Sequence, residues 1–206
     1  MSGKVYVVGI GPGSKEYILP KAIDTLIKCD LIVGFKRAVE SLEFIDVNKI
    51  VVSKIVEVID IINSDKYKSI GIVASGDPLF YGITDYIKKN YLKNIEVIPG
   101  LSSFQYMMAK LGKSWHGSFL GSLHGREQNF YEIVKENKIS IWLTDSKHSP
   151  SYMCSMLKEK NIKATIYVGQ NLSYEDEKII SGSIEEIGNM EFDGLSVAVV
   201  ENLSKE

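Results

Sequence analysis

Ser75-Gly76-Asp77-Pro78-Leu79-Phe80-Tyr81-Gly82 directly follows an apolar run at residues 70–74, and this run predicts a buried strand. Gly76 has no Cβ, so a ligand can approach the backbone of this turn closely. Pro78 suits the first turn of a helix, and Asp77 just before it can cap that helix. The pattern therefore predicts a helix that begins near Pro78 and has these apolar residues on one face: Phe80, Ile83, Tyr86 and Ile87.

Glycine-containing turns of the same kind follow three other strand-like runs. They are Gly9-Ile10-Gly11-Pro12-Gly13, Gly34, and Pro99-Gly100-Leu101-Ser102-Ser103. Helical patterns lie between the runs, and strands that alternate with helices predict a mostly parallel sheet covered on both faces. Ligands of such sheets bind beyond the carboxyl ends of the strands, which is where all of these turns lie.

Residues 112–118 interrupt the alternation, and we interpret them as a linker between two lobes. A second alternating set follows, and it ends in a strand that returns after a loop and one last strand. These strands are expected at 119–123, 139–143, 164–169, 178–180 and 195–200, with helices at 129–136 and 150–159. The sequence therefore predicts an α/β fold of two αβα lobes, residues 1–112 and 113–206, with a ligand-binding cleft between them.

The composition argues against several classes of protein. The 206 residues carry a net charge of -2, which gives no basic surface for nucleic acid. The two cysteines, Cys29 and Cys154, form no CxxC pair, so neither a disulfide framework nor a zinc site is indicated. We expect a reduced, cytoplasmic location. The apolar stretch near the N-terminus is too short for a signal peptide or a membrane span.

The first glycine turn resembles a dinucleotide-binding fingerprint but lacks its chemistry. Ser14 stands at the third glycine position, and Pro12 removes a backbone donor where a pyrophosphate needs one. The acidic residue expected ~20 positions further, at the end of the second strand, is missing. No glycine loop ends in Gly-Lys-Ser/Thr, so a Walker loop is absent. The turns suit adenosine and a sulfonium, a ligand of little anionic charge, better than phosphates.

Three of these motifs, in this order, resemble the tetrapyrrole (corrin and porphyrin) methylase family: Gly9-Ile10-Gly11-Pro12-Gly13, Ser75-Gly76-Asp77-Pro78, and Ile98-Pro99-Gly100-Leu101-Ser102-Ser103. Two more resemble its C5-methylating branch in cobalamin biosynthesis: Ser122-Leu123-His124-Gly125-Arg126 and Asn171-Leu172-Ser173-Tyr174-Glu175-Asp176-Glu177-Lys178-Ile179. The resemblance covers residues 4–201. It implies methyl transfer from S-adenosylmethionine (SAM) to a corrin precursor, S-adenosylhomocysteine as the product, and a homodimer.

Carried over position by position, the resemblance implies SAM contacts in both lobes. In the first lobe they are Pro12, Ser75, Gly76, Asp77, Phe80, Ser102 and Ser103. In the second lobe they are Leu143, Leu172, Leu195 and Ser196. The chain departs from the family at Ser75, where glycine is common, at Leu79 and at Pro20. The resemblance is to a single methylase module, which further implies that the chain catalyses the C5 step alone. C15 methylation and decarboxylation would then belong to another polypeptide, and the substrate ring would already contain cobalt.

Methyl transfer to carbon depends on alignment and on exclusion of water more than on a nucleophilic side chain. His124 is our candidate for a base that removes the C5 proton, because histidine titrates near neutrality; alternatively, it hydrogen-bonds a neighbouring loop. Arg126 either binds a substrate carboxylate or is a solvated arginine. Tyr81 either packs against the ring or belongs to the core. No His/Cys cluster indicates a protein-bound metal, so cobalt would arrive inside the substrate.

Two alternative functions remain open. The same scaffold can methylate another precorrin carbon, uroporphyrinogen, a diphthine precursor or ribosomal RNA, although the net charge of -2 counts against RNA. The chain can instead be a nucleotide-binding or interaction module without catalysis, which measurable SAM turnover would exclude.

Overall fold

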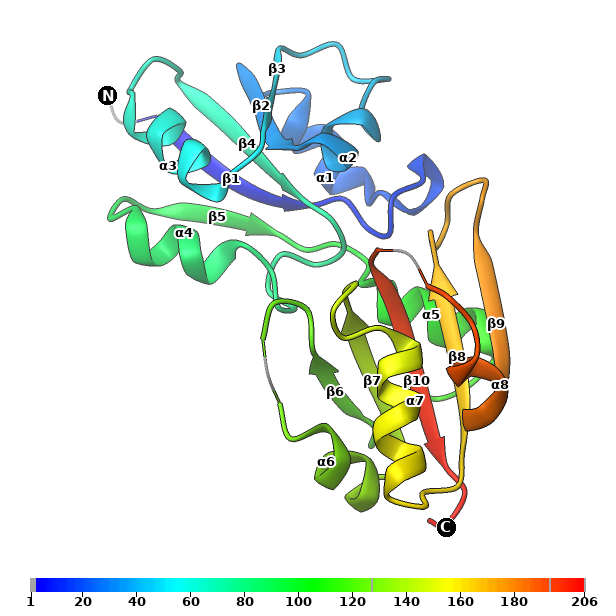
Figure 1. Cartoon of the computed structure of the whole chain (residues 1–206). Coiled ribbons are helices and arrows are strands. Elements are labelled where there is room, and N and C mark those ends of the chain that lie inside the picture. Colours follow the sequence, from blue (N-terminus) through cyan, green and yellow to red (C-terminus); the bar gives the residue numbers. More distant parts are fainter. Residues whose placement is uncertain (1–2, 127, 193, 206) are drawn as a thin grey trace. The chain divides into compact units, whose positions relative to one another are not determined.

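The chain folds into two compact units, Met1–Ser103 and Phe104–Glu206. The computed structural model describes residues 3–126, 128–192 and 194–205. Each unit contains one five-stranded sheet with helices packed against it (Figure 1). The α/β class predicted from the alternation of strands and helices is confirmed.

The first unit is built on a parallel sheet with the strand order β3-β2-β4-β1-β5. β1 pairs with β4 up to the partners Gly9 and Ala74, so the turns after these two strands leave the sheet at the same edge. The elements of the unit are β1 (Lys4–Gly9), η1 (Lys15–Tyr17), α1 (Pro20–Leu26), β2 (Leu31–Phe35), α2 (Lys36–Glu40), β3 (Lys49–Val52), α3 (Ile55–Asn63), β4 (Ser69–Ala74), α4 (Thr84–Asn90) and β5 (Ile95–Ile98).

Helices cover both faces of the first sheet. α1 and α2 pack on one face, in a buried cluster that contains Leu26 and the strand residue Val8. α3 and α4 pack on the other face, where Val58 and Ile87 lie in a second cluster with Val7. Val7 and Val8 belong to different clusters because successive side chains of a strand point to opposite faces. This arrangement explains why the strands of this unit read as continuous apolar runs.

The second unit is built on a mixed sheet with the order β6-β7-β10-β8-β9. β6 and β7 are parallel, whereas β10 is antiparallel to β7 and β8, and β8 is antiparallel to β9. The strand that was expected to return after a loop, at 178–180, is β9, and its antiparallel pairing with β8 contributes to the mixed character of this sheet. The elements are α5 (Ser103–Leu111), β6 (Phe119–Ser122), α6 (Phe130–Glu136), β7 (Ile139–Thr144), α7 (Pro150–Glu159), β8 (Ala164–Gln170), β9 (Lys178–Ser183), α8 (Ile184–Gly188) and β10 (Ser196–Asn202).

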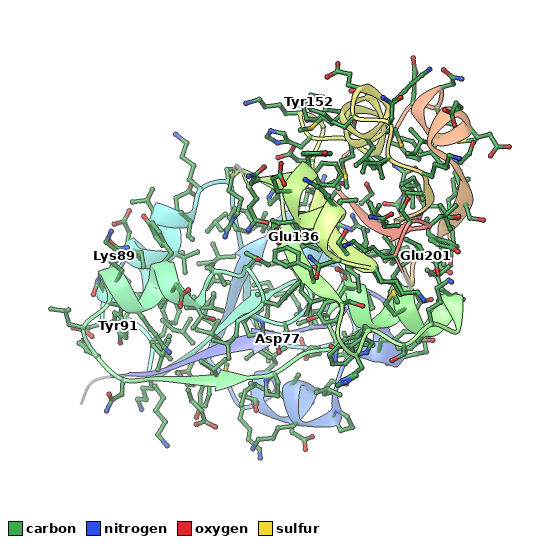
Figure 2. All side chains as sticks on the ribbon, turned by 90° about the horizontal axis from the view of Figure 1, so that it is seen from below. Asp77, Lys89, Tyr91, Glu136, Tyr152 and Glu201 are labelled. Atoms are coloured by element: carbon green, nitrogen blue, oxygen red, sulfur yellow. The ribbon has the colours of Figure 1, made fainter. Side chains whose placement is uncertain are left out.

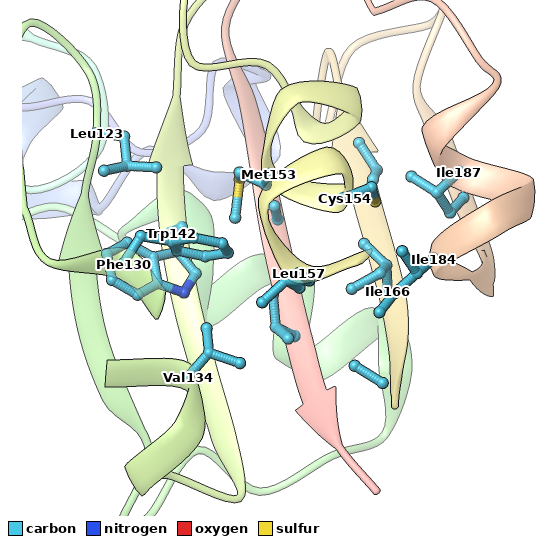
Figure 3. Close-up of a cluster of buried hydrophobic side chains, with 14 of the residues drawn as sticks. Leu123, Phe130, Val134, Trp142, Met153, Cys154, Leu157, Ile166, Ile184 and Ile187 are labelled. Carbon is cyan, nitrogen blue, oxygen red and sulfur yellow. The ribbon is translucent and has the colours of Figure 1, made fainter. Parts of the chain in front are cut away.

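Trp142 on β7 is fully buried in the main core of the second unit and lies beside Phe130 (Figure 3). Its indole N–H donates to Ser140 Oγ at 2.8 Å, so the polar atom of this large side chain is satisfied. Phe130 from α6 packs edge-on against it at 5.0 Å between ring centroids. α7 and α8 complete the core with residues such as Leu157 and Ile187. One face of the second sheet is thus covered by α6, α7 and α8.

α5 belongs to the second unit, although the sequence suggested a division after it, at Gly112. The compact units divide after its first residue, between Ser103 and Phe104. A Cβ at Gly169 on β8 would lie 2.7 Å from Met107 Sδ, so this glycine lets α5 pack closely on the sheet. Two ion pairs also join α5 and the residues just after it to the rest of the unit: Lys110–Glu177 at 3.1 Å and Lys113–Glu201 at 2.9 Å.

The chain after β4 does not form the helix that was expected to begin near Pro78, since α4 begins only at Thr84. Thr84 Oγ1 donates to the carbonyl oxygen of Pro78 at 2.6 Å and holds the intervening residues in a turn. Within this turn Tyr81 has a φ of 52°, which interrupts a right-handed helix. Asp77 therefore caps no helix, and its carboxylate has another role.

α8 is a helix that the sequence analysis missed. Ser183 Oγ accepts a hydrogen bond from the N–H of Glu186 at 3.2 Å, and the Glu186 carboxylate accepts one from the N–H of Ser183 at 2.7 Å. This is a capping box, and the pattern Ser-x-x-Glu at 183–186 is a signal that could have predicted the helix.

Among the described residues, no helix is long and apolar enough to cross a membrane, and no group of three His, Cys, Asp or Glu side chains could hold a metal ion. Cys29 and Cys154 are buried free thiols. Burial, reinforced by the charge of Asp30, raises the pKa of Cys29 to about 11. Burial, with the charge of Glu185, raises the pKa of Cys154 to about 12, so both thiols are expected to be unreactive at neutral pH.

Candidate functional site

Hydrogen bonds join three of the glycine turns of the first unit, those after β1, β4 and β5; Gly34, the fourth glycine, lies inside β2. Gly11 and Gly76 bond reciprocally through their backbones, with N–H to carbonyl distances of 3.3 and 2.7 Å. Asp77 Oδ1 accepts from the N–H of Leu79 at 2.8 Å, and Asp77 Oδ2 accepts from the N–H of Gly100 at 3.2 Å. Asp77 is labelled in Figure 2. The turns after β1, β4 and β5 therefore form one continuous surface at the carboxyl edge of the sheet.

Glycine is required where these turns approach most closely. A Cβ at Gly9 would lie 2.6 Å from the backbone nitrogen of Gly100 and 2.7 Å from the carbonyl oxygen of Gly76, and neither backbone atom can move without shifting a turn. Gly76 differs, because it has a φ of 69° and its added Cβ would meet nothing closer than 3.8 Å, at Ser102 Cα. Gly9 is thus needed for packing and Gly76 for its backbone conformation.

The side chains predicted to line these turns differ in exposure. Ser75 is exposed, and Pro12 and Ser102 are buried. Phe80 and Tyr81 are half-buried and pack edge to face, with ring centroids 5.0 Å apart. Ser103 follows the third turn as the first residue of α5.

Two histidines and one aspartate meet at the carboxyl ends of β6 and β7 in the second unit. Asp145 Oδ2 accepts from the N–H of Gly125 at 2.9 Å and lies 3.7 Å from His124 Nδ1. Asp145 Oδ1 accepts from the N–H of His148 at 2.7 Å and lies 3.4 Å from His148 Nδ1. The His124 side chain is 56% exposed, whereas those of Asp145 and His148 are 18% and 12% exposed. His124 therefore faces solvent while its two neighbours are largely enclosed.

The surroundings of Asp145 favour its ionised form. Burial opposes ionisation, but the backbone hydrogen bonds from His148 and Gly125, and then the two nearby imidazoles, outweigh it and lower the pKa of this carboxyl. A permanently charged acceptor thus lies beside His124 at neutral pH.

The remaining predicted residues of the second unit lie at the same edge of its sheet. Ser196 begins β10, is buried, and its Oγ lies 2.6 Å from Thr144 Oγ1. Leu143 is half-buried, and its carbonyl accepts from the N–H of Leu123, directly before His124. Leu172, just after β8, is buried and packs against Gly169, while Leu195 is 54% exposed. His124, Leu143, Leu172, Leu195 and Ser196 are thus brought to one edge by the strand pairing.

Arg126 follows at the same edge. Its side chain is exposed, and its backbone N–H donates to the carbonyl of Leu123 at 3.4 Å.

Neither Asp145 nor His148 was predicted from the sequence as a site residue. Asp145 follows directly after the apolar run of β7, and a carboxylate at the end of a buried strand was a usable signal. Nothing in the local sequence indicated that it would contact His124, since the two residues meet through the parallel pairing of β6 and β7.

Residues 4–188 match the sequence profile of the tetrapyrrole (corrin/porphyrin) methylases, and the chain therefore belongs to this family. A protein of Methanocaldococcus jannaschii, the probable cobalt-precorrin-7 C(5)-methyltransferase, is 37% identical over 207 residues, which cover 96% of this chain and 97% of the relative. The cobalt-precorrin-7 C(5)-methyltransferase of Salmonella typhimurium is 29% identical over 84% of this chain and 87% of its own length.

Solved structures of other proteins have the same fold. The precorrin-6Y methylase of Archaeoglobus fulgidus has a TM-score of 0.76 at 20% identity and matches 97% of this chain and 98% of its own. The uroporphyrin-III C-methyl transferase of Thermus thermophilus, solved with S-adenosyl homocysteine, has a TM-score of 0.82 at 18% identity, with 97% of each chain covered. These likenesses confirm the α/β fold predicted from the sequence.

Proposed function

We propose that this protein transfers a methyl group from SAM to C5 of a cobalt-precorrin, cobalt-precorrin-7, in cobalamin biosynthesis. The observation that carries the proposal is the 37% identity, along almost the whole of both chains, to a relative that is named for this reaction. The Ser122–Arg126 motif, which resembles the C5-methylating branch, lies at the edge of the second sheet together with the other predicted residues of that unit.

The turns of the first unit suit the adenosine part of SAM. They offer an uncharged polar group, the exposed Ser75 hydroxyl, and an apolar ring, the half-buried Phe80, whereas Pro12 and Gly76 are buried. Because Gly76 has no Cβ, a ligand that reaches this turn could approach its backbone closely. Asp77, by contrast, has both oxygens engaged with the turns, so we assign it the role of holding the cofactor surface in shape. We keep Ser102 and Ser103, and Leu143, Leu172, Leu195 and Ser196 of the second unit, as SAM contacts by family position.

The reaction requires one bond exchange and one proton transfer. C5 of the conjugated ring forms a bond to the methyl carbon while the bond from sulfur to that carbon breaks, and the sulfur keeps the electron pair. C5 then carries both its hydrogen and the new methyl group, so removal of the hydrogen as a proton restores the conjugation. The protein contributes by aligning the two reactants and by excluding water.

His124 is our candidate for the base that takes this proton. It is solvent-facing, so a substrate can reach it and the proton can afterwards pass to water. The carboxylate of Asp145, whose Oδ2 lies 3.7 Å from His124 Nδ1, is its neighbour on the protein side. Arg126, two residues later and exposed, is our candidate for binding one of the carboxylates at the rim of the ring. Tyr81 is a candidate for packing against the ring face.

The proposal extends to assembly and location. By family resemblance we expect a cytoplasmic homodimer and a separate enzyme for the C15 step. Light scattering during size-exclusion chromatography would measure the mass of the assembly, and a monomer at micromolar concentration would contradict the dimer.

The first experiment is calorimetric titration with S-adenosylhomocysteine and, in parallel, with NADH. We expect a saturable signal near one site per chain for the former alone. Anaerobic incubation with cobalt-precorrin-7 and SAM carrying a ¹³C-labelled methyl group should then give a product whose label is attached to C5 by NMR. Label at another carbon would support the alternative acceptor, and absence of S-adenosylhomocysteine binding would contradict the methyltransferase function.

A further inference from the structure

Asp145 lies near two imidazoles. If its only role were to hold the loops through backbone hydrogen bonds, neither imidazole would be needed. Each of its oxygens accepts one backbone hydrogen bond, from Gly125 to Oδ2 and from His148 to Oδ1. Each oxygen also has a histidine Nδ1 on its other side, at 3.7 Å for His124 and 3.4 Å for His148. An ionised carboxylate has about four lone-pair positions, so these four neighbours can be served at once.

We propose that Asp145 is a positioning residue for His124, which it holds with Nδ1 toward the carboxylate and Nε2 toward the substrate. The inference rests on the function proposed above, because it assigns the atom that accepts the C5 proton. The distance of 3.7 Å is too long for a hydrogen bond in the free protein. Contacts of this kind commonly tighten when the substrate binds, and we expect the same of this pair.

His148 keeps the carboxylate from turning away from His124. Its side chain is 12% exposed, and its ring packs edge-on against Tyr152 of α7 at 5.7 Å between centroids. Its Nδ1 is buried and has no hydrogen-bond partner among the described residues, with Asp145 Oδ1 as its ion-pair neighbour. The backbone of His124 is fixed as well, because its N–H donates to Ser122 Oγ at 3.3 Å. The imidazole of His124 can therefore move mainly by rotation about its side-chain bonds, and we propose that Asp145 restricts this rotation.

This placement determines the path of the proton. With its Nδ1–H directed at Asp145, neutral His124 presents the lone pair of Nε2 to the substrate. The electron pair of the broken C5–H bond returns to the ring, and the proton forms the new Nε2–H bond. The resulting imidazolium lies beside a carboxylate that stays ionised, and the exposed face of the ring releases the proton to water.

The tautomer of His124 tests the proposal without any assay of activity. In ¹⁵N-labelled protein at a pH where the ring is neutral, two-bond ¹⁵N–¹H ring correlations distinguish the Nδ1–H form from the Nε2–H form. We expect the Nδ1–H form to predominate in the wild type and to lose population in Asp145→Asn. A wild-type His124 that carries its proton on Nε2 would overturn the proposal, whether or not the variant folds.

A double-mutant cycle on methyl transfer tests the same link kinetically. Asp145→Asn should lower kcat on the order of 10²-fold with little change in KM, because a misplaced catalytic group costs roughly that factor. In a His124→Ala background the same substitution should change kcat by less than about 2-fold. A further large loss in that background would mean that Asp145 acts independently of His124, and would overturn the proposal.

Controls separate this inference from the proposed function. Asp60→Asn is the control, because it also removes one negative charge but lies at an exposed position of α3, outside the glycine turns and the Asp145 cluster. It should leave kcat and the His124 spectrum unchanged. Thermal unfolding of Asp145→Asn reports any loss of the two backbone hydrogen bonds. If the wild type transfers no methyl group to a cobalt-precorrin, the proposed function fails while the tautomer measurement still decides the placement of His124.

Discussion

Asp77 and Gly100 are separated by 23 positions in the chain and are joined by a hydrogen bond of 3.2 Å, from the Gly100 N–H to Asp77 Oδ2. The other oxygen of the same carboxylate accepts from Leu79 at 2.8 Å. One side chain thus fixes the shape of its own turn and attaches it to the turn after β5. Asp77 therefore links two turns, which it would not do as the cap of a helix.

Replacing Asp77 by alanine should weaken both folding and cofactor binding. Two hydrogen bonds to a charged acceptor are lost, so the free energy of unfolding should fall by about 2–4 kcal/mol. Urea unfolding measures this loss, and calorimetric titration with S-adenosylhomocysteine should show weaker binding. Asp60→Ala, at an exposed position of α3, is the control and should alter neither quantity. Unchanged stability in Asp77→Ala would mean that the turns do not depend on this carboxylate.

Gly9→Ala should distort the cofactor surface through overpacking. The new methyl group would lie 2.6 Å from Gly100 N and 2.7 Å from Gly76 O, and such contacts cost roughly 1–3 kcal/mol. Gly112→Ala is the matched control, because nothing lies within 4 Å of its added Cβ and only its φ of 61° is unfavourable. Both variants should lose stability, but only Gly9→Ala should bind S-adenosylhomocysteine more weakly. Equal affinities would contradict a cofactor site at these turns.

His124→Ala should slow methyl transfer without releasing the cofactor. Loss of a general base typically reduces the rate by about 10²–10⁴-fold. Binding of S-adenosylhomocysteine and of the precorrin should stay within a factor of about 2 of the wild type, since the variant leaves the glycine turns intact. Single-turnover measurements under anaerobic conditions separate the chemical step from binding. Near-normal turnover would leave His124 with a loop-bonding role only.

Glu201 should make the second unit sensitive to acid. A hydrogen bond from Lys113 is the largest cause that lowers its pKa; burial opposes this, and the Tyr167 hydroxyl, at 2.9 Å, adds to the lowering. Because the folded-state pKa is depressed, the stabilisation is complete above the usual glutamate pKa of about 4.3 and is lost as the pH falls through the lower folded-state value.

Urea midpoints measured between pH 7 and pH 3 test this dependence. Glu201→Gln should lower stability at pH 7 and show a shallower decline toward pH 3 than the wild type. Glu159→Gln, at the exposed end of α7, is the control and should follow the wild-type curve. Parallel curves for Glu201→Gln and the wild type would show that this ion pair contributes no acid sensitivity.

The fold could be predicted where local sequence alone specifies the structure. The central strands of the first unit, β1, β2 and β4, are short and largely buried apolar runs, and such runs are visible without knowledge of their partners. The mixed second sheet could not be predicted this way, because the direction of β10 depends on pairing with β7 and β8. The turn after Pro78 was mistaken for a helix because its geometry depends on the bond from Thr84 to the Pro78 carbonyl.

The candidate site could be predicted from the sequence only where its residues follow apolar runs. The glycine turns were visible in the sequence because Gly9 and Gly76 follow apolar runs, and the structure joins these turns. Asp145 and His148 were not predicted as site residues, because only the pairing of β6 with β7 brings them to His124. The roles assigned to His124, Arg126 and the SAM contacts remain predictions.

The position of β10 in the second sheet determines when this unit can fold during synthesis. β10 spans Ser196–Asn202 and is the last strand in the chain, yet it lies in the middle of the sheet between β7 and β8. Until the ribosome has released this segment, β7 and β8 each have an unpaired edge that can associate with other chains. The second unit therefore completes its sheet only after β10 has been translated, whereas β5, the last strand of the first sheet, ends at Ile98 and permits earlier folding of that unit.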